Sequence, residues 1–509
     1  MSGINVTATA VFIFFFALVT IMGFIAARWK AGDLNELHEW GLGGRRFGSW
    51  ITWFLLGGDL YTAYTVIAVP AVVYAIGAYG FFAVPYTILI YPFIFLTMPR
   101  LWNATHKRGY LTGADFVYGA YGNKWLEGMV ALTGIIATMP YIALQLVGME
   151  KVIQALGFPH EGMTGHLPLT IAFLILAVYT YRSGLRAPAM IAFVKDIMIY
   201  IFVIAAVIII PAKLGGYGAI FDSAQKDFAA QLAANPSAPA RGILLAPAQI
   251  WPFITLAIGS AMALFMYPHS LTGVLSASGP KAIRHNAISL PAYSLVLALI
   301  AMLGYMAHAA GIKVQNPQDA VPQLFLAMFP SWFVGFTFAA IAIGALVPAA
   351  VMSIGAANTF TRNLWRPFVN QNMSPSEEST LAKLMSLVVK IGALIVILFL
   401  PTQFALDLQL LGGVWMIQIF PAIIFGLYTR WYKGGALLAG LIVGLALGTY
   451  LSYGPTSWVP VSKAFLGIPL YNGLTAVLAN VIVATVLSFI LPASKSDELT
   501  EADFRDAHA

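Results

Sequence analysis

The chain has 509 residues, of which 60% are hydrophobic and only 9% are charged, and its mean hydropathy is +0.82. Soluble domains carry about 25% charged residues, so this composition excludes a soluble protein and predicts one polytopic membrane domain. Cysteine is absent, which excludes disulfides, a thiol nucleophile and thiolate metal sites.

Apolar segments long enough to cross about 30 Å of hydrocarbon recur from end to end. The first, "INVTATAVFIFFFALVTIMGFIAARWK", carries its positive charges after the apolar run, whereas a secretory signal carries them before it. We therefore expect a retained first span and an all-α fold of about thirteen spans. They are predicted at 5–27, 49–76, 80–99, 126–156, 167–181, 188–211, 248–272, 287–310, 333–357, 384–400, 405–428, 434–452 and 471–491.

The charges indicate the orientation of these spans. If the N-terminus is outside, nineteen of the 27 lysines and arginines fall in cytoplasmic segments and five in external ones. Such a bias is what the positive-inside rule expects. The net charge of +7 is thus a consequence of topology, and no nucleic-acid partner is expected.

Two segments are not predicted to span. Residues 212–247 place Phe221, Phe228 and Leu232 on one helical face, which predicts an interfacial helix in an external, periplasmic loop. Residues 493–509 are polar and are expected to be a disordered cytoplasmic tail. Residues 1–492 then form a single transmembrane domain.

Two predicted spans are interrupted within their apolar runs. The second contains Gly57-Gly58-Asp59 and Pro70, and the seventh contains Gly259-Ser260 and Pro268-His269. Gly and Pro are common in membrane helices, which explains either interruption alone. Paired interruptions five spans apart, entering from opposite sides, instead indicate a midplane binding site in an inverted-repeat transporter.

The sixth span raises a question of its own. Lys195 and Asp196 are adjacent inside "APAMIAFVKDIMIYIFVIAAVIII". An ionised side chain near the bilayer centre costs roughly 2.5–3.5 kcal/mol on insertion scales, so such residues usually have a function.

Three stretches resemble the sodium/solute symporter family. They are "HEWGLGGRRFGSW" (38–50), "YRSGLRAPAMIAFVKD" (181–196) and "MSIGAANTFTRNLWRPF" (352–368). Residues 266–308 and 344–363 look most like its bacterial monocarboxylate permeases. This resemblance implies the leucine-transporter fold, with inverted five-helix repeats from spans 2–6 (about 49–211) and 7–11 (about 248–428). It also implies a bacterial inner membrane location.

The chain departs from the family pattern at the coupling ion. The positions of the hydroxyl residues that hold sodium in sodium-coupled members correspond to Val347 and Pro348, which offer no side-chain oxygen to a cation. The family's threonine before Asp196 is replaced by Lys195. We therefore hypothesise that the Lys195 ammonium takes the place of sodium and couples transport to protons, with Asp196 modulating it. A structural ion pair with Asp59 and snorkelling to the inner interface are the alternatives. Asp59 is also a candidate ion-pathway carboxylate.

Hydroxyl, imidazole and amide groups near the two interruptions are the candidate substrate ligands. They are Tyr61, Thr62, Tyr64, Thr65, Ser260, Tyr267, His269, Gln145, Trp415 and Gln418. Alternatives stay open for several of them: packing or gating for the tyrosines, backbone capping for His269, helix–helix bonding for the glutamines, and core packing for Trp415.

The predicted function is secondary active symport of short monocarboxylates (lactate, pyruvate, acetate, propionate) by alternating access, coupled to protons. The alternative is a sodium-coupled symporter of a sugar, amino acid or nucleoside. We expect no enzymatic activity, cofactor or metal site, because the histidines lack an HExxH-type spacing. A channel would need a repeated filter, and a sensor would need a signalling domain.

Overall fold

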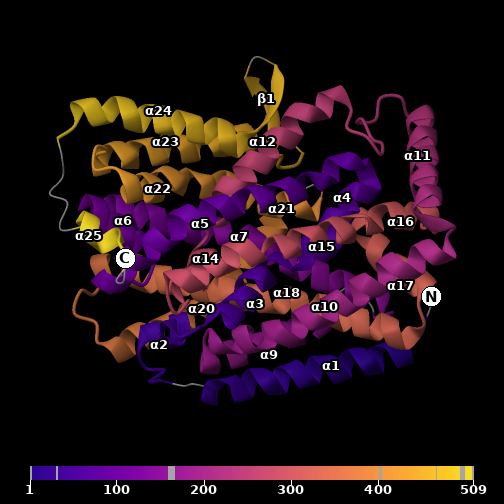
Figure 1. The fold of residues 1–509 in the computed structure, drawn as a ribbon, viewed down its shortest axis with the longest axis horizontal. Coiled ribbons are helices and arrows are strands. Elements are labelled where there is room, and N and C mark those ends of the chain that lie inside the picture. Colours follow the sequence, from indigo (N-terminus) through magenta and orange to yellow (C-terminus); the bar gives the residue numbers. More distant parts are fainter. Residues whose placement is uncertain are drawn as a thin grey trace.

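Most helices run side by side along one direction (Figure 1). The computed structural model describes residues 3–29, 32–158, 167–399, 404–454, 456–465, 467–492 and 499–506. The helices are α1 (Val6–Ile25), α2 (Leu37–Leu42), α3 (Ser49–Leu60), α4 (Val69–Ile76), α5 (Ala83–Arg108), α6 (Gly113–Tyr121), α7 (Lys124–Ala155), α9 (Leu167–Ser183), α10 (Arg186–Lys213), α11 (Gly216–Ala234), α12 (Pro247–Leu264), α13 (Pro268–Leu275), α14 (Pro280–Ser289), α15 (Pro291–Ala301), α16 (Leu303–Ala309), α17 (Ala320–Met328), α18 (Ser331–Phe360), α19 (Arg366–Phe368), α20 (Pro375–Phe399), α21 (Ala405–Met416), α22 (Phe420–Tyr428), α23 (Gly434–Ser452), α24 (Asn472–Ile490) and α25 (Glu501–Phe504). A π-helical turn, η3 (Tyr64–Ala68), precedes α4.

The prediction of an all-helical membrane protein is confirmed. Within the described residues, 11 helical segments are long and apolar enough to cross a membrane, and the bent pair of α3 with η3 and α4 makes 12. The remaining predicted span corresponds to α9, which has 17 residues. The one sheet in the described part of the chain is an antiparallel hairpin of β1 (Val461–Phe465) and β2 (Ile468–Tyr471).

Local signals account for several helix ends. Asn123 accepts hydrogen bonds from the backbone N–H groups of Trp125 and Leu126, and so begins α7. Gly122, with φ of 60°, ends α6, because glycine adopts this left-handed conformation without strain. The loop between these two helices is therefore short and defined by its own sequence.

The two ends of the bundle carry different short helices. Figure 1 shows α11 across one end, which we call the outer end, and α25 at the opposite, inner end. Helix α11 buries Ile220, Ala224 and Phe228. The Phe228 ring lies 4.7 Å from the His308 ring on α16. The helix predicted for this loop is thus packed on α16.

The chain near its C-terminus differs from the sequence expectation. Residues 499–506, expected to be disordered, form α25 and dock on α5. Asp503 pairs with Arg108 at 2.8 Å, Asp506 pairs with Arg284 at 2.8 Å, and Phe504 is buried. The expectation was wrong here because basic side chains from distant helices supply partners that the tail's own sequence does not reveal.

Helix α18 occupies the centre of the structure. Its most apolar 18-residue window is entirely buried, whereas that of α1 is only 17% buried. Helix α18 packs on α7, α10, α13 and α20 as well as α1. It therefore lies beside both interrupted spans and the helix that carries Lys195.

The two interruptions lie a few residues after the predicted glycines. In span 2 the helix stops at Leu60 and resumes in η3, with a bend of 42°. In span 7 it stops at Leu264 and resumes at Pro268, which begins α13. Gly57 and Gly259 are inside helices, where a Cβ atom would lie 2.1 Å from Tyr293 and 2.4 Å from Tyr471. These glycines allow close packing rather than breaking the helix.

Candidate substrate and ion site

The break in span 2 frees backbone groups that find specific partners. The N–H of Ala63 donates to Oε1 of Gln145 at 3.1 Å, and the N–H of Tyr64 donates to Oγ1 of Thr62 at 3.0 Å. The Thr65 hydroxyl donates to the carbonyl oxygen of Leu60. Backbone groups inside a membrane need such partners, so these residues stabilise the break itself.

Two other carbonyl groups at this break face Lys195. Its Nζ donates to the carbonyl oxygens of Gly58 at 2.5 Å and Tyr61 at 3.0 Å. It also lies 3.0 Å from Oδ1 of Asp196, and both side chains are fully buried. The ammonium thus lies against the interrupted helix and pairs with its sequence neighbour, not with Asp59. Its burial also excludes snorkelling to the interface.

Aromatic side chains enclose this ion pair. The Tyr293 hydroxyl donates to Oδ2 of Asp196 at 2.6 Å. The Tyr61 hydroxyl donates to the backbone carbonyl of Tyr293 at 3.2 Å, and the two rings lie 4.4 Å apart. The Tyr200 ring lies 5.7 Å from that of Tyr61. The phenol of Tyr61 therefore belongs to the wall around the ion pair.

Asp59 joins the two broken spans. Its Oδ2 lies 3.3 Å from Nε2 of His269 and accepts a hydrogen bond from the Ser270 hydroxyl at 3.2 Å. His269 and Ser270 are the second and third residues of α13, directly after the second break. A carboxylate from span 2 thus lies at the start of the second half of span 7.

Two buried positions of α18 that the sequence resemblance aligns with sodium ligands carry apolar side chains. Val347 and Pro348 are buried in α18. Gly344 lies one turn before Pro348. A Cβ atom added to Gly344 would lie 3.7 Å from the Tyr61 carbonyl oxygen. The carbonyl groups at the break consequently face the Lys195 ammonium on one side and an apolar helix on the other.

Two polar groups around the second break have no protein partner. Within the described residues, the Ser260 hydroxyl and Nδ1 of His269 are buried and accept or donate no hydrogen bond. The Tyr267 hydroxyl donates to the Gln409 carbonyl at 3.4 Å. Buried polar groups are normally paired, so free ones beside a helix break are available to a ligand.

Three predicted ligands have other roles in the structure. Both the oxygen and the nitrogen of the Gln145 side-chain amide form hydrogen bonds with backbone groups, since Nε2 also donates to the Tyr141 carbonyl at 3.3 Å. The Gln418 amide donates to the carbonyls of Val414 and Gly473, which joins α21 and the following turn to α24. Trp415 donates to the Thr449 hydroxyl on α23. Gln418 and Trp415 therefore face the last two spans rather than the breaks.

The structure adds residues that sequence reasoning missed. Tyr293 and Ser270 contact the acidic groups directly. Tyr141 places its ring 5.6 Å from those of both Tyr267 and His269. Ser270 follows the Pro-His pair, and Tyr141 lies one turn before Gln145 on the same helix face, so helix spacing alone pointed to these two. No comparable sequence signal exists for Tyr293.

The site is closed to solvent. Lys195, Asp196, Tyr64, Ser260 and His269 expose at most 2% of their surface. A cavity of about 640 Å³ at the inner end is lined by charged groups that include Arg45 and Glu378. Another of about 540 Å³ lies near α11 at the outer end. A buried polar site between cavities at opposite ends is the arrangement expected of an occluded transporter.

Two broken helices joined through Asp59 and His269, one of them beside a buried ion pair, are the arrangement expected of a secondary transporter. The solved structure of a Na⁺-coupled sialic acid symporter, in a substrate-bound outward-open state, shares this fold. It has a TM-score of 0.77 at 16% sequence identity and covers 97% of this chain and 99% of that one. The expected leucine-transporter fold is thereby confirmed.

The chain belongs to the Sodium:solute symporter family, whose model matches residues 40–444. A monocarboxylate transport permease protein of Rhizobium johnstonii is 59% identical over 494 residues, which cover 96% of this chain and 98% of the relative. The uncharacterized symporter YodF of Bacillus subtilis is 34% identical over 95% of this chain and 93% of its own length. The chain is therefore a symporter and not an enzyme, as predicted.

Proposed function

We propose that this symporter imports short monocarboxylates together with protons, by alternating access. The observation that carries the coupling is the Lys195 ammonium, which donates to the carbonyl groups of Gly58 and Tyr61 at the break in span 2. The family resemblance predicts a sodium ion at this place, and a hard cation needs several oxygen ligands there. With Val347 and Pro348 on the neighbouring face, a tethered positive charge substitutes for the ion.

The coupling proton is carried on Lys195. In the closed site the ammonium donates hydrogen bonds to two carbonyl groups and forms an ion pair with Asp196. When α3 moves relative to α10, the carbonyl acceptors leave and the ammonium passes its proton to the Asp196 carboxylate. Both groups are then neutral, and Asp196 keeps its bond from Tyr293 until water reaches it from the inner end.

The substrate carboxylate binds between the two breaks. The Ser260 hydroxyl is a buried donor without a protein partner, and His269 lies at the same break with its Nε2 beside Asp59. The start of α13 adds the positive end of a helix dipole, which favours an anion. A single helix start suits a single negative charge, and the name of the Rhizobium relative supports a monocarboxylate.

We propose the same arrangement of repeats and the same orientation that the sequence predicts. Residues 49–211 and 248–428 form the two inverted repeats, and α11 lies in the loop 212–247 that joins them. We place the N-terminus and α11 outside the cell and the inner end in the cytoplasm, with the chain in a bacterial inner membrane. The charge bias of the loops supports this orientation.

Uptake of labelled lactate into proteoliposomes tests the proposal. An inside-alkaline pH gradient in sodium-free buffer is compared with a sodium gradient at equal pH, and protein-free liposomes report passive entry of undissociated acid. Protein-dependent accumulation with the pH gradient alone is expected. Pyruvate, acetate and propionate are then compared as competitors.

Sodium coupling to another small solute is the second candidate. The family description and the Na⁺-coupled structural neighbour favour it. Accumulation with sodium alone would support this candidate and remove the proton role of Lys195. If neither gradient drives lactate, a panel of sugars, amino acids and nucleosides follows under both gradients.

A further inference from the structure

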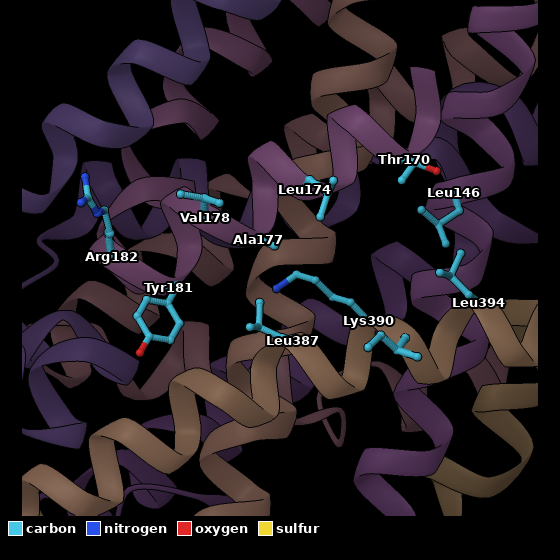
Figure 2. Close-up of a pocket in the computed structure, with 11 residues that line it drawn as sticks. Leu146, Thr170, Leu174, Ala177, Val178, Tyr181, Arg182, Leu387, Lys390 and Leu394 are labelled. Atoms are coloured by element: carbon cyan, nitrogen blue, oxygen red, sulfur yellow. The ribbon is translucent and has the colours of Figure 1, made fainter. Parts of the chain in front are cut away.

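A second buried lysine lies in a cavity that the transport site does not use. The cavity has a volume of about 590 Å³ and lies between α9 and α20, with Leu146 of α7 at one end (Figure 2). This volume falls within the range of small-molecule sites. The helix faces around it are directed outward, since Leu174 of α9 and Leu394 of α20 expose 60% and 44% of their surface. In a membrane protein such faces contact lipid chains.

Lys390 is the buried cation of this cavity, and Arg182 lies at its edge. Its side chain is 2% exposed, and its Nζ donates to the backbone carbonyl of Ser386 at 3.1 Å. Among the described residues, no carboxylate lies within 4 Å of it, whereas Lys195 has Asp196 and two carbonyl groups at its helix break. Ionisable groups inside membranes normally pair with an opposite charge or face a cavity that receives one. Lys390 has the cavity but no anion from the described protein.

The lining defines what anion fits. Apart from Lys390, the side chains that surround the middle of the cavity in Figure 2 are apolar, including Leu174, Ala177 and Leu387. Tyr181 and Arg182 lie at one end, and Leu146, Leu394 and the hydroxyl-bearing Thr170 at the other. An occupant must therefore place one negative charge at Lys390 and an apolar chain along the remaining wall. A bulky polar head beside Lys390 would leave its own hydrogen-bonding groups unpaired.

The depth of Lys390 distinguishes between amphiphiles. It lies 15 residues after the start of α20, or roughly 22 Å along the helix at 1.5 Å per residue. Arg182, in the last turn of α9, is the cation of this cavity at the level of a helix end, where phospholipid phosphates reside. A compact carboxylate reaches the deeper lysine, and a phosphodiester head does not.

We propose that the cavity between α9 and α20 binds a long-chain carboxylate, a free fatty acid anion, with its head on Lys390 and its chain toward Leu146 and Leu394. The site shares no residue with the transport site. A charge-assisted hydrogen bond holds the head, and burial of methylene groups holds the chain.

Photolabelling of the full chain in nanodiscs tests the proposal. The probe is a sixteen-carbon acid with a diazirine in its chain, and adducts are mapped by mass spectrometry. We expect saturable labelling of residues 170–182 and 387–394, competition by palmitate, and no competition by methyl palmitate. Because hydrogen bonds to charged groups contribute about 1.5–3 kcal/mol, Lys390→Met is expected to reduce the apparent affinity by about tenfold or more.

Variants separate charge from folding. Lys390→Arg keeps the charge and should retain labelling. Lys383→Met makes the same change on the same helix, where the lysine bonds the Leu34 carbonyl outside the cavity, and should label like the unmodified protein. Equal competition by methyl palmitate would overturn the proposal, as would competition by phosphatidylglycerol alone. If a second copy of the protein packs over α9 and α20 and labelling is then lost, the proposal would also be wrong.

Discussion

Replacing Lys195 with methionine separates transport from coupling. The substitution removes the ammonium from the carbonyl groups of Gly58 and Tyr61 and from Asp196, while keeping an unbranched apolar chain of similar length. It leaves the Asp196 carboxylate buried with Tyr293 as its remaining hydrogen-bond donor. Removing one partner of a buried ion pair typically costs about 3–5 kcal/mol of stability.

The accumulation that proton coupling can sustain follows from the pH gradient. One pH unit stores about 1.4 kcal/mol per proton, so symport of one proton with one monoanion sustains about tenfold accumulation per unit. A gradient of two units therefore gives about a hundredfold accumulation of lactate in the unmodified protein. Without a proton carrier at residue 195, we expect the protein-dependent accumulation to fall to about one. Exchange of labelled for unlabelled lactate should persist, because it needs no net proton movement.

The assay is the proteoliposome uptake described above, with two further variants. Lys213→Met is the matched control on the same helix, since this lysine bonds the Met328 carbonyl at the outer end. Lys195→Met with Asp196→Asn removes both buried charges and should recover stability, but not accumulation. Hundredfold, pH-driven accumulation by Lys195→Met, at the level of the Lys213 control, would refute the proton role of Lys195.

Three further predictions concern the breaks and the outer end. Gln145→Leu orphans the Ala63 N–H and should lower unfolding stability by about 1–3 kcal/mol, measured by thermal unfolding of the purified protein; an unchanged midpoint would contradict the bond. Ser260→Ala should raise the KM for substrate without loss of stability, whereas Trp415→Phe should leave the KM unchanged; the reverse pattern would move the substrate away from the breaks. Burial raises the pKa of Asp227, but hydrogen bonds from Lys313 and His308 outweigh this effect and hold the pKa below its ordinary value of 3.8. Because this pKa is lowered, the stabilisation of α11 is present above about pH 4 and is lost as the pH falls below it. Hydrogen exchange in α11, corrected for the intrinsic rate, should therefore accelerate in acid, and Asp227→Asn should show no such acid dependence.

The location of the two breaks shows how far local signals reach. Gly and Pro correctly indicated which spans are interrupted, because both residues disfavour a continuous helix. They did not indicate where, since Gly57 and Gly259 remain helical and serve the approach of Tyr293 and Tyr471. A glycine allows a break or a close contact equally, and only the neighbouring helix decides between them.

The glutamines show the same limit for side chains. Gln145 and Gln418 are equivalent in sequence terms, each one of two glutamines in its apolar span. In the structure the first closes the break in span 2 and the second joins α21 to α24. An amide satisfies whichever backbone groups the packing brings to it, so its role is not encoded in its own span.

The sequence by itself determined the class, the helical spans, the family and the unusual place of Lys195 inside an apolar span, because hydropathy and residue type act locally along the chain. Only the tertiary structure decided that Lys195 bonds the carbonyl groups of span 2, that Asp59 meets His269, and that the tail residue Asp503 docks on Arg108. Each of these contacts joins residues far apart in the chain. Their geometry depends on how the helices pack around α18, which no single segment specifies.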